Sequence, residues 1–265
     1  MKRFFPISFF LFFLLGTGCA KLTAPVAEIP TPFPPSSVLI QEVSTDAVRG
    51  QYILPSERTG KLPGILVIHE WWGLNDQIKE EAKKLAAEGY AVFAVDLYDG
   101  EVAADAKRAG ELAGGVRQNP EAAVRKMKAA LDYLAAQQEV ESEKLASLGW
   151  CFGGGQSALV GTTADPRLKA TVIYYGTPIT DVTALAEMKQ PVLGIWGETD
   201  QSIPVASVRS FEEALKKQQT PVEFHYYPDA GHAFANPTRG DAYRPEAATD
   251  AWQKTLDFLS RTLKR

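Results

Sequence analysis

Cysteine and basic charge are both scarce in this chain of 265 residues. Its two cysteines, Cys19 and Cys151, are too few for the disulfide framework of a small secreted scaffold. Lys and Arg number 28 against 32 Asp and Glu, which gives a net charge of −4. The chain therefore lacks the basic excess with which proteins neutralise phosphates, and we expect no nucleic-acid partner.

Long apolar runs are scarce as well. One stretch, residues 4–15, is almost entirely apolar, but it is too short to be a comfortable membrane span. Hydrophobic residues make up 45% and charged residues 23% of the chain, which is ordinary globular usage. This composition excludes a disordered, collagenous or multi-span membrane protein. The length fits either one large α/β domain with an appendage or two domains.

The N-terminal segment, residues 1–18, is predicted to be a signal peptide. Lys2 and Arg3 precede the apolar run, and small residues lead to Cys19. This end resembles the lipobox of bacterial lipoproteins, although Gly16 stands where a leucine is usual. We therefore expect an exported protein that a lipid on Cys19 anchors to a membrane, on the periplasmic or cell-surface side. Cleavage without lipidation would instead release a secreted protein, and a buried N-terminal helix is the least favoured alternative.

Proline is concentrated between the signal peptide and the rest of the chain. Residues 19–36 are predicted to be a linker, because proline at this density favours polyproline II and opposes helix and sheet. The linker prolines are Pro25, Pro30, Pro32, Pro34 and Pro35. This composition fits either a stalk or, over the last few residues, a strap packed on the domain. The folded domain is expected over residues 37–265.

Strand and helix patterns alternate along the predicted domain. Two β-branched runs at 38–43 and 48–54, joined by a turn signal, predict an antiparallel hairpin. Apolar runs predict buried strands at 65–68, 90–95, 145–150, 169–175, 191–196 and 221–227. Helices are expected between Asn75 and Gly89 and at 101–117, 120–138, 152–161, 182–189, 204–219 and 246–263. This alternation predicts an α/β fold with a mostly parallel central sheet, helices on both faces and an N-terminal hairpin.

The residues that follow the parallel strands are the first candidates for a functional site, because ligands bind beyond the carboxyl ends of such strands. The segment from Gly149 to Gly153 has the form of a nucleophile elbow, with Cys151 at its centre. The two glycines fit the tight strand-to-helix turn, and the N-terminus of the next helix favours negative charge. A phosphate cradle and a merely buried cysteine are the alternatives, and the first lacks the P-loop and dinucleotide patterns.

An acid and a histidine follow the nucleophile in the chain order expected for this architecture. Asp200 comes just after one predicted strand and His232 just after the next, so both lie where the strand ends meet. Glu198 is the weaker rival to Asp200, and Asp229 is expected to shape a turn instead. The other two histidines lie at a strand end, His69, and within a strand, His225.

Four motifs in this order are similar to the dienelactone hydrolase family. They are residues 149–154, 197–200 and 230–234, together with the run His69-Glu70-Trp71-Trp72-Gly73. The set is specific, although each motif alone is weak, and the similarity extends from residue 38 to the C-terminus. The resemblance implies an α/β-hydrolase fold, a cysteine nucleophile and hydrolysis of a small-molecule ester or lactone without a cofactor.

The same resemblance implies a role for each site residue. Cys151 attacks the substrate carbonyl, His232 transfers the proton and Asp200 orients His232. Glu70 stands where a glutamate helps to form the thiolate, and the backbone N–H groups of Trp71 and Phe152 hold the oxyanion. The aromatic residues that could line the pocket, or equally belong to the core, are Trp71, Trp72, Tyr98, Trp150, Trp196 and Phe234.

The sequence departs from the family where the substrate is held. Dienelactone hydrolase uses two arginines for the substrate carboxylate, and their places are taken here by Gly100, which follows Asp99, and by Asn236. Arg239 and Arg244 are near enough in sequence to replace them. We therefore expect neutral esters or lactones to be better substrates than carboxylated dienelactones.

Two further classes of function remain open. One is a general carboxylesterase or thioesterase. The other is a non-catalytic binding lipoprotein of the same fold, which the intact set of Cys151, Asp200 and His232 disfavours. We expect no metal site, because the segment that begins with His69-Glu70 lacks the second histidine of the H-E-x-x-H zinc motif.

Overall fold

A computed structural model describes Met1 and residues 38–264 of the chain. The predicted signal peptide, the lipidation site at Cys19 and the linker over 19–36 lie outside the described residues, apart from Met1. The first strand of the described domain begins at Val38.

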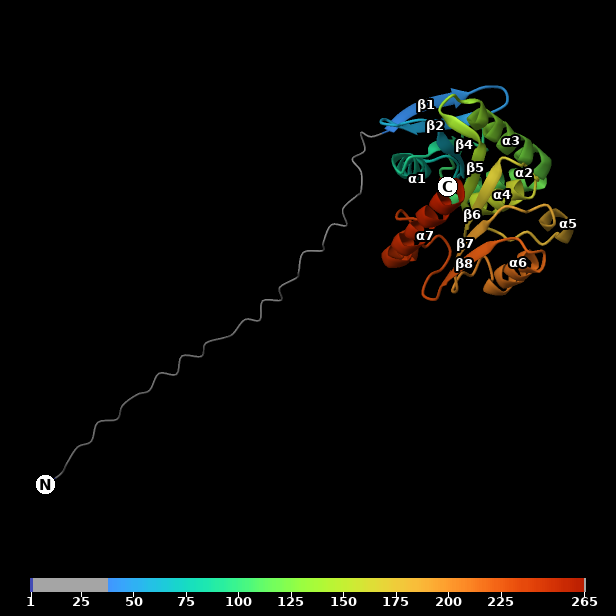
Figure 1. Cartoon of the computed structure of the whole chain (residues 1–265). Helices are drawn as coiled ribbons and strands as arrows, with labels where there is room; N and C mark the ends of the chain where they lie inside the picture. The colour runs from blue at the N-terminus through green and yellow to red at the C-terminus, as the bar shows by residue number, and fades with distance from the viewer. Residues whose placement is uncertain (2–37, 265) are drawn as a thin grey trace. The chain divides into compact units, whose positions relative to one another are not determined.

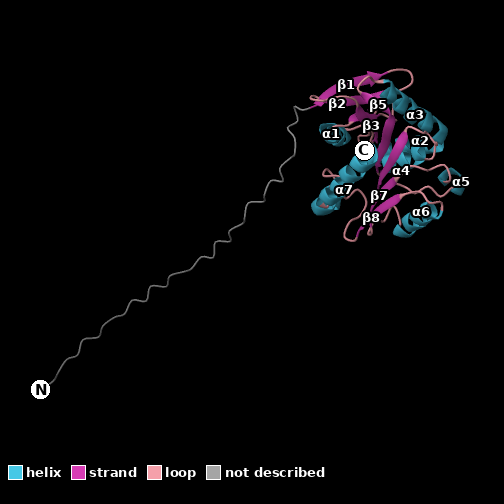
Figure 2. Ribbon diagram, viewed as in Figure 1, coloured by secondary structure: helices cyan, strands magenta, loops and turns pink. Residues whose placement is uncertain are grey.

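The domain is built on one sheet of eight strands in the order β1-β2-β4-β3-β5-β6-β7-β8. The strands are β1 Val38–Ser44, β2 Arg49–Pro55, β3 Leu62–Ile68, β4 Ala91–Val95, β5 Val140–Trp150, β6 Leu168–Tyr174, β7 Val192–Gly197 and β8 Val222–Tyr227. β1 pairs with β2 and β2 with β4 in antiparallel fashion, whereas all the other pairs are parallel. The predicted α/β-hydrolase-like fold and its N-terminal hairpin are confirmed (Figures 1 and 2).

Helices cover both faces of the sheet. They are α1 Asp76–Ala87, α2 Ala106–Gln118, α3 Pro120–Ala136, α4 Phe152–Gly161, α5 Val182–Leu185, α6 Val205–Lys217 and α7 Pro245–Leu263, with a 3₁₀ turn at Gly240–Ala242. Figure 1 shows α1 and α7 on one face and α2, α3 and α6 on the other. Ile78 of α1 and Leu259 of α7 belong to one buried cluster, and Met127 and Leu131 of α3 belong to a second. The sheet is therefore shielded on both faces, which explains its continuously apolar central strands.

Several elements begin or end at other residues than the sequence predicts: β3 starts at Leu62 rather than at 65, and α5 ends at Leu185 rather than at 189. The largest shifts are in the first residues of β5 and α2. β5 starts at Val140 rather than at 145, because Val140 pairs with Leu62 of β3. The residues after Val140 are polar, so the sequence does not show the apolar pattern of a buried strand there. α2 starts at Ala106 rather than at 101, because the side chain of Asp105 accepts the N–H of Arg108 and so caps the helix there. Both differences lie away from the ends of the strands that carry the candidate site.

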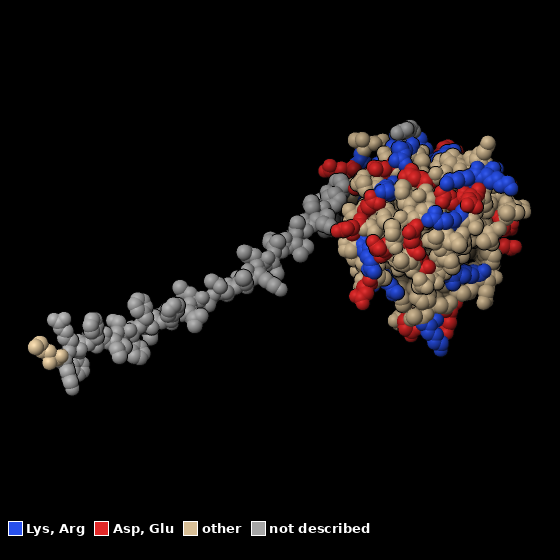
Figure 3. All heavy atoms as spheres, turned by 90° about the horizontal axis from the view of Figure 1, so that it is seen from below, with Lys and Arg blue, Asp and Glu red and all other residues tan. Residues whose placement is uncertain are grey.

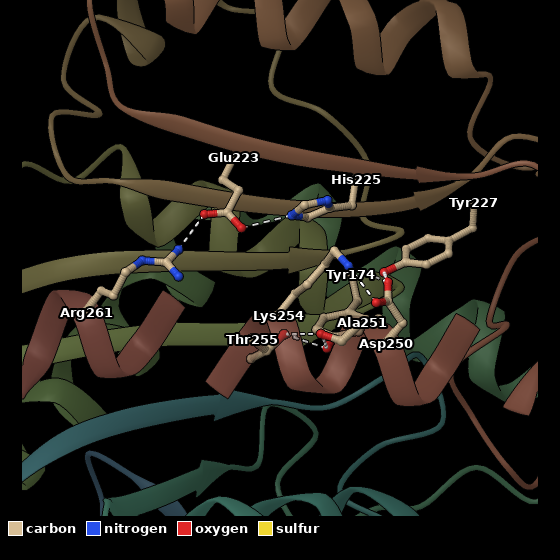
Figure 4. Close-up of polar contacts among 9 residues, drawn as sticks. All are labelled: Tyr174, Glu223, His225, Tyr227, Asp250, Ala251, Lys254, Thr255 and Arg261. Atoms are coloured by element: carbon tan, nitrogen blue, oxygen red, sulfur yellow. Dashed lines mark hydrogen bonds and ion pairs between the residues drawn. The ribbon is translucent and has the colours of Figure 1, made fainter. Parts of the chain in front are cut away.

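The C-terminal helix α7 is fixed to the sheet by polar contacts as well as by apolar packing (Figure 4). Tyr174 Oη, at the end of β6, donates to the Ala251 carbonyl at 3.0 Å and lies 2.6 Å from Thr255 Oγ1. Tyr227 Oη, at the end of β8, donates to Asp250 at 2.7 Å. His225 Nε2 lies 2.9 Å from Glu223, so this histidine belongs to the α7 side of β8 and not to the candidate site.

Charges of both signs are mixed on the surface. On the face drawn in Figure 3, Lys and Arg alternate with Asp and Glu without a large patch of one sign. Ion pairs such as Arg108–Glu101 and Arg261–Glu223 account for part of this mixture. Among residues 38–264, no helix is both long enough and apolar enough to cross a bilayer.

Candidate active site

The candidate residues follow three parallel strands of the sheet. Cys151 comes directly after β5, Asp200 three residues after β7, and His232 five residues after β8. Because these strands run parallel, their carboxyl ends meet at the same edge. The structure brings all three side chains together there.

The turn at Cys151 is strained. It leaves no room for a side chain at the position two residues before Cys151 or at the position two residues after it. Cys151 has φ 54° and ψ −117°, which costs a residue other than glycine on the order of 1–3 kcal/mol. A Cβ on Gly149 would overlap the Gly153 carbonyl, and a Cβ on Gly153 would overlap the Ile68 carbonyl. The two glycines therefore let α4 start hard against the ends of β5 and β3.

A hydrogen-bonded chain links the three side chains. His232 Nε2 lies 3.0 Å from Cys151 Sγ, and His232 Nδ1 donates to Asp200 Oδ2 at 2.7 Å. The other oxygen, Asp200 Oδ1, accepts the backbone N–H groups of Ser202 at 2.7 Å and Ile203 at 2.9 Å. These bonds fix the Asp200 carboxylate and thereby the orientation of the imidazole.

Neither the weaker rival, Glu198, nor the expected turn residue, Asp229, takes the place of Asp200. Glu198 pairs with Arg209 at 3.0 Å. Asp229 lies in the turn that follows β8, where its carbonyl accepts from Arg244 Nε at 3.1 Å. Neither carboxylate contacts His232 in the described structure.

The hydrogen bonds among Cys151, His232 and Asp200 favour the charged form of the His232 imidazole. Burial alone would lower the pKa of His232, but its hydrogen bonds to Asp200 and Cys151 outweigh burial and raise the pKa to about 10. Burial alone would raise the pKa of Asp200, but the hydrogen bonds from His232 and the backbone hold it below its usual range. Asp200 is therefore ionised and His232 protonated over the neutral pH range.

Glu70 is buried, with 2% of its surface exposed. Its Oε2 accepts from Asn236 Nδ2 at 2.9 Å. Burial raises the pKa of Glu70, and the hydrogen bond from Asn236 and the charges of His232 and Arg239 only partly oppose that effect. Asn236, which replaces an expected arginine, is thus directed to Glu70.

His69 holds the loop that carries Glu70 and Trp71. Its Nδ1 donates to the Glu70 carbonyl at 2.6 Å, while its Nε2 accepts the Leu97 N–H at 3.2 Å. The ring is fully buried and stacks on Phe152 with a centroid distance of 5.8 Å. Burial lowers the pKa of His69 to about 4, so the ring is neutral and structural at neutral pH.

The expected oxyanion donors are unpaired. Among residues 38–264, neither the backbone N–H of Trp71 nor that of Phe152 donates to a protein acceptor. Phe152 is the first residue of α4, where a backbone N–H lacks an intrahelical partner. The contact of Gly153 with the end of β3 places this N–H beside the loop that contains Trp71.

The predicted pocket residues separate into two groups. Tyr98 Oη donates to the Trp71 carbonyl at 3.2 Å, and Trp71 packs edge-on against Trp72, so these residues surround the start of α4. Trp150 and Phe234 belong to the buried core, which is one of the two alternatives that the sequence leaves open for the aromatic residues. Trp150 is 3% and Phe234 0% exposed, because strand alternation directs Trp150 onto Tyr174 and Phe234 packs between two tyrosines. Trp196 is also fully buried, and its indole N–H donates to the Gly176 carbonyl.

The two arginines proposed as replacements differ in position. The guanidinium of Arg239 lies 5.8 Å from the ring centroid of Trp72 and is near enough to Glu70 to influence its pKa. Arg244 instead donates to the carbonyls of Asp229, Asp241 and Tyr243. Arg239 is therefore the arginine that the structure brings to the site.

Metal ligands are not clustered in the part of the chain that the structure describes. No group of three or more His, Cys, Asp or Glu residues there is arranged to hold an ion. The residues around Cys151 form hydrogen bonds to one another instead.

Sequence reasoning missed Tyr175. This residue follows β6 directly, has φ 35°, and its ring lies 5.3 Å from that of His232. Ending the predicted strand at 174 rather than at 175 would have placed it among the residues that follow strands. No sequence signal marks Asn236 or His69 as partners of Glu70, because both contacts depend on loop conformation.

The strand order, the strained turn and the hydrogen-bonded chain define an α/β-hydrolase-like protein. Residues 48–263 match the model of the dienelactone hydrolase family. A protein of Methylorubrum extorquens, named provisionally as a carboxymethylenebutenolidase, is 32% identical over 263 aligned positions, covering 92% of this chain and 89% of that protein. The protein usf of Aquifex pyrophilus is 34% identical over 206 positions, covering 76% and 89%. The chain therefore belongs to the dienelactone hydrolase family.

Solved structures agree with this assignment. The crystal structure of a dienelactone hydrolase-like promiscuous phosphotriesterase from metagenomic libraries has a TM-score of 0.78 at 27% identity. The match covers 85% of this chain and 99% of that one, so the fold is shared over the whole of the other domain.

Proposed function

We propose that the protein hydrolyses an ester or lactone through Cys151, His232 and Asp200, with an acyl-cysteine intermediate. One observation carries the proposal: the strained Cys151 lies 3.0 Å from His232 Nε2, and His232 Nδ1 lies 2.7 Å from a buried carboxylate. A nucleophile, a base and a group that orients the base are the minimum for this chemistry. Membership of the dienelactone hydrolase family supports the same reaction class.

In the proposed first half-reaction, the Cys151 sulfur attacks the carbonyl carbon after its proton has passed to His232. A carbon–sulfur bond forms, and the carbonyl electron pair moves to oxygen. The free N–H groups of Trp71 and Phe152 stabilise this oxyanion. As the oxyanion collapses, the carbon–oxygen bond breaks and His232 gives its proton to the departing alkoxide.

In the second half-reaction, a water molecule attacks the acyl-cysteine. His232 accepts the proton of that water, and the second oxyanion collapses to the carboxylic acid. The sulfur leaves as the thiolate, so the charged pair of Cys151 and His232 is restored. When the substrate is a lactone, the alkoxide of the first step remains attached to the acyl group.

Neutral esters and lactones are the proposed substrates. Asn236 points to Glu70 and carries no charge, and Arg239 is exposed, so solvent screens its attraction for a carboxylate. We expect kcat/KM for a neutral ester or lactone to exceed that for a carboxylated dienelactone by at least about tenfold.

A screen of chromogenic esters and lactones on the purified domain tests the reaction and the preference together. Faster hydrolysis of the carboxylated lactone would contradict the preference but not the reaction. If the carboxylated lactone were hydrolysed faster, Arg239→Ala would be tested on it, with Arg244→Ala as the matched control. Loss of the activity in Arg239→Ala alone would show that Arg239 holds the substrate carboxylate. No turnover of any ester or lactone would contradict the reaction itself.

The proposed location is the outer side of a membrane, to which the lipidated Cys19 would attach the domain. The support is the signal-like sequence of residues 1–18 and the small residues before Cys19. Wild-type protein should fractionate with membranes, and Cys19→Ala should release it. A wild-type protein found wholly in the soluble exported fraction would contradict lipidation.

A further inference from the structure

One histidine contacts both of the residues that would supply the oxyanion donors. His69 Nδ1 lies 2.6 Å from the carbonyl oxygen of Glu70, and the peptide of that carbonyl carries the N–H of Trp71. The ring of the same histidine stacks on Phe152 at a centroid distance of 5.8 Å. His69 is fully buried, so bulk water does not compete for its ring nitrogens. The two donor residues, which are far apart in the sequence, therefore share His69 as a neighbour.

The hydrogen bonds of His69 fix which ring nitrogen carries the proton. The backbone N–H of Leu97 can only donate, and its acceptor is His69 Nε2 at 3.2 Å. Nε2 is therefore the nitrogen without a proton. Because an imidazole ring keeps at least one proton, that proton lies on Nδ1, which donates it to the Glu70 carbonyl. The direction of the 2.6 Å bond thus follows from the backbone geometry of Leu97.

The trans peptide between Glu70 and Trp71 transmits this bond to the Trp71 N–H. In a planar trans peptide the C=O and N–H bonds point in opposite directions, so a donor that holds the carbonyl also sets the direction of the N–H. A hydrogen bond to the carbonyl also polarises the peptide, which makes its N–H a stronger donor. Among residues 38–264 this N–H has no acceptor, so it is available to a ligand.

The second oxyanion donor is built in the same way. The Phe152 N–H belongs to the peptide whose carbonyl is that of Cys151, and this carbonyl accepts the N–H of Gly155 at 3.2 Å. The first turn of α4 supplies that bond, so the helix itself orients and polarises the Phe152 N–H. The loop after β3 has no helix at the corresponding point, and a side chain, that of His69, donates to the carbonyl instead.

The Glu70 carbonyl has one further donor, the backbone N–H of Gly73 at 3.2 Å. That bond is longer than the 2.6 Å bond from His69, and it lies within the same short turn, so it moves with the loop. His69 is different because its other nitrogen is bound to Leu97, two residues after β4. The bond from His69 therefore fixes the peptide relative to the sheet.

We propose that His69 is a positioning residue for the oxyanion site. Its Nδ1–H holds and polarises the peptide between Glu70 and Trp71, so that the Trp71 N–H is directed at the oxyanion before the substrate binds. This inference rests on the proposed function of Cys151, because the oxyanion forms only in that reaction. It leaves the role implied for the Glu70 carboxylate unchanged.

Two amide substitutions separate the two nitrogens of the ring. In His69→Asn, the side-chain Nδ2 takes the place of ring Nδ1 and can still donate to the Glu70 carbonyl. In His69→Gln, the amide reaches the place of Nε2, where its Oε1 can accept from Leu97, and no side chain then donates to Glu70. Each variant loses one of two hydrogen bonds, so both should be destabilised to a similar extent. His225→Gln, a histidine-to-amide change on β8 away from the site, is the matched control.

We expect His69→Gln to lower kcat for an ester by at least about tenfold and to change KM by less than about threefold. The oxyanion exists only in the transition states and intermediates, and removing a whole oxyanion donor costs about 10²–10³-fold in kcat. His69→Asn should keep kcat within about threefold of wild type, and His225→Gln should match wild type. Equal losses of kcat in the two His69 variants, or no loss in His69→Gln, would overturn the inference.

Reaction of Cys151 with methyl methanethiosulfonate distinguishes this role from a general loosening of the site. The thiolate attacks a sulfur atom, a disulfide forms and methanesulfinate leaves, so no oxyanion develops on a carbonyl. We expect the rate of this reaction in His69→Gln to stay within about twofold of wild type. A loss of labelling as large as the loss of kcat would overturn the inference, because it would show that His69 only holds the loop.

The proposed function can fail separately from this inference. If wild-type protein hydrolyses no ester or lactone, the reaction is contradicted, and the amide nitrogen resonance of Trp71 then tests His69. This resonance responds to hydrogen bonding at the preceding carbonyl, so it should move upfield in His69→Gln and stay near its wild-type position in His69→Asn. An unchanged resonance in His69→Gln would overturn the inference.

Should His69→Gln fail to fold, the nitrogen spectrum of His69 in the wild-type protein replaces the comparison. The inference requires a protonated Nδ1 and an unprotonated Nε2. The opposite tautomer could not donate to the Glu70 carbonyl and would overturn the inference.

Discussion

Burial and hydrogen bonding act in opposite directions on the acid and base of the candidate site. Burial favours the neutral forms of Asp200 and His232, yet the bond between them keeps both charged. The Asp200 carboxylate accepts hydrogen bonds from His232 and from two backbone N–H groups. A protonated carboxyl group would accept from these three donors less well. Asp200 and Cys151 are the two residues whose interactions raise the pKa of His232, and the hydrogen bond to Asp200 is the largest single contribution among them.

The variant Asp200→Asn tests this dependence. Without the carboxylate, the pKa of His232 should fall from about 10 toward its ordinary value. His232 then loses its proton at lower pH, so the alkaline limb of kcat/KM should move down by at least about one pH unit. A pH–rate profile measures this shift, with Glu198→Gln as the control. An alkaline limb that stays in place would mean that Asp200 does not set the charge of His232.

For single residues, the sequence is a better guide to which catalytic side chains come together than to which residues surround them. Cys151, Asp200 and His232 converge because each follows a parallel strand, and that rule needs no side-chain detail. For Trp150 the sequence leaves both pocket and core open, and only the structure shows that strand alternation turns the indole onto Tyr174 in the core. Tyr175 was missed because one residue decides whether a position belongs to a strand or to the loop after it.

Among the elements, α7 shows how the far end of the chain supports the site. Tyr174 closes β6 just before Tyr175, and its hydroxyl is hydrogen-bonded to α7 in a fully buried position. Tyr227 makes a comparable bond from β8 to Asp250, but that contact is exposed (Figure 4). The two tyrosines are thus a matched pair that differs mainly in burial.

We expect Tyr174→Phe to lower the free energy of unfolding by about 1–3 kcal/mol, because buried groups on α7 lose their partner. Tyr227→Phe should cost less than about 1 kcal/mol, because water replaces the lost bond. Urea unfolding of both variants measures the difference. Equal losses would contradict the view that Tyr174 anchors α7.

The element boundaries show where sequence patterns fail. The strand prediction over 65–68 succeeds because a strand buried on both faces is apolar throughout. The start of β5 is missed because Val140 is followed by polar residues, so only its pairing with Leu62 shows that the strand begins there. The start of α2 could have been found from the Asp105 cap alone, which is a local signal.

For the whole molecule, His69 links stability to pH. It is fully buried and neutral, and both ring nitrogens are used by the backbone of two loops. In the unfolded chain this histidine takes up a proton near pH 6.5, whereas in the folded domain it stays neutral down to about 4. Its contribution to stability is therefore present above pH 6.5 and is lost as the pH falls toward 4.

Because of this shift, we expect the stabilisation that His69 provides to fall by about 2 kcal/mol when the pH is lowered from 7.5 to 5. The free energy of unfolding should fall by the same amount. The variant His69→Asn should be less stable at pH 7.5 but should lack this part of the pH dependence. Urea unfolding of both proteins at the two pH values measures it, and the difference between their slopes removes the effect of all other groups. Parallel slopes would show that His69 is not held neutral.

The central claim, that Cys151 is the nucleophile of an ester or lactone hydrolase, is tested most directly by the rate of Cys151→Ala. On the best ester or lactone from the screen, this variant should lose at least about 10³-fold in kcat/KM, or about 4 kcal/mol of transition-state stabilisation. With a slow substrate, acid-quenched wild-type protein should carry the acyl group on Cys151 by mass spectrometry. Near-normal turnover by folded Cys151→Ala would contradict the account.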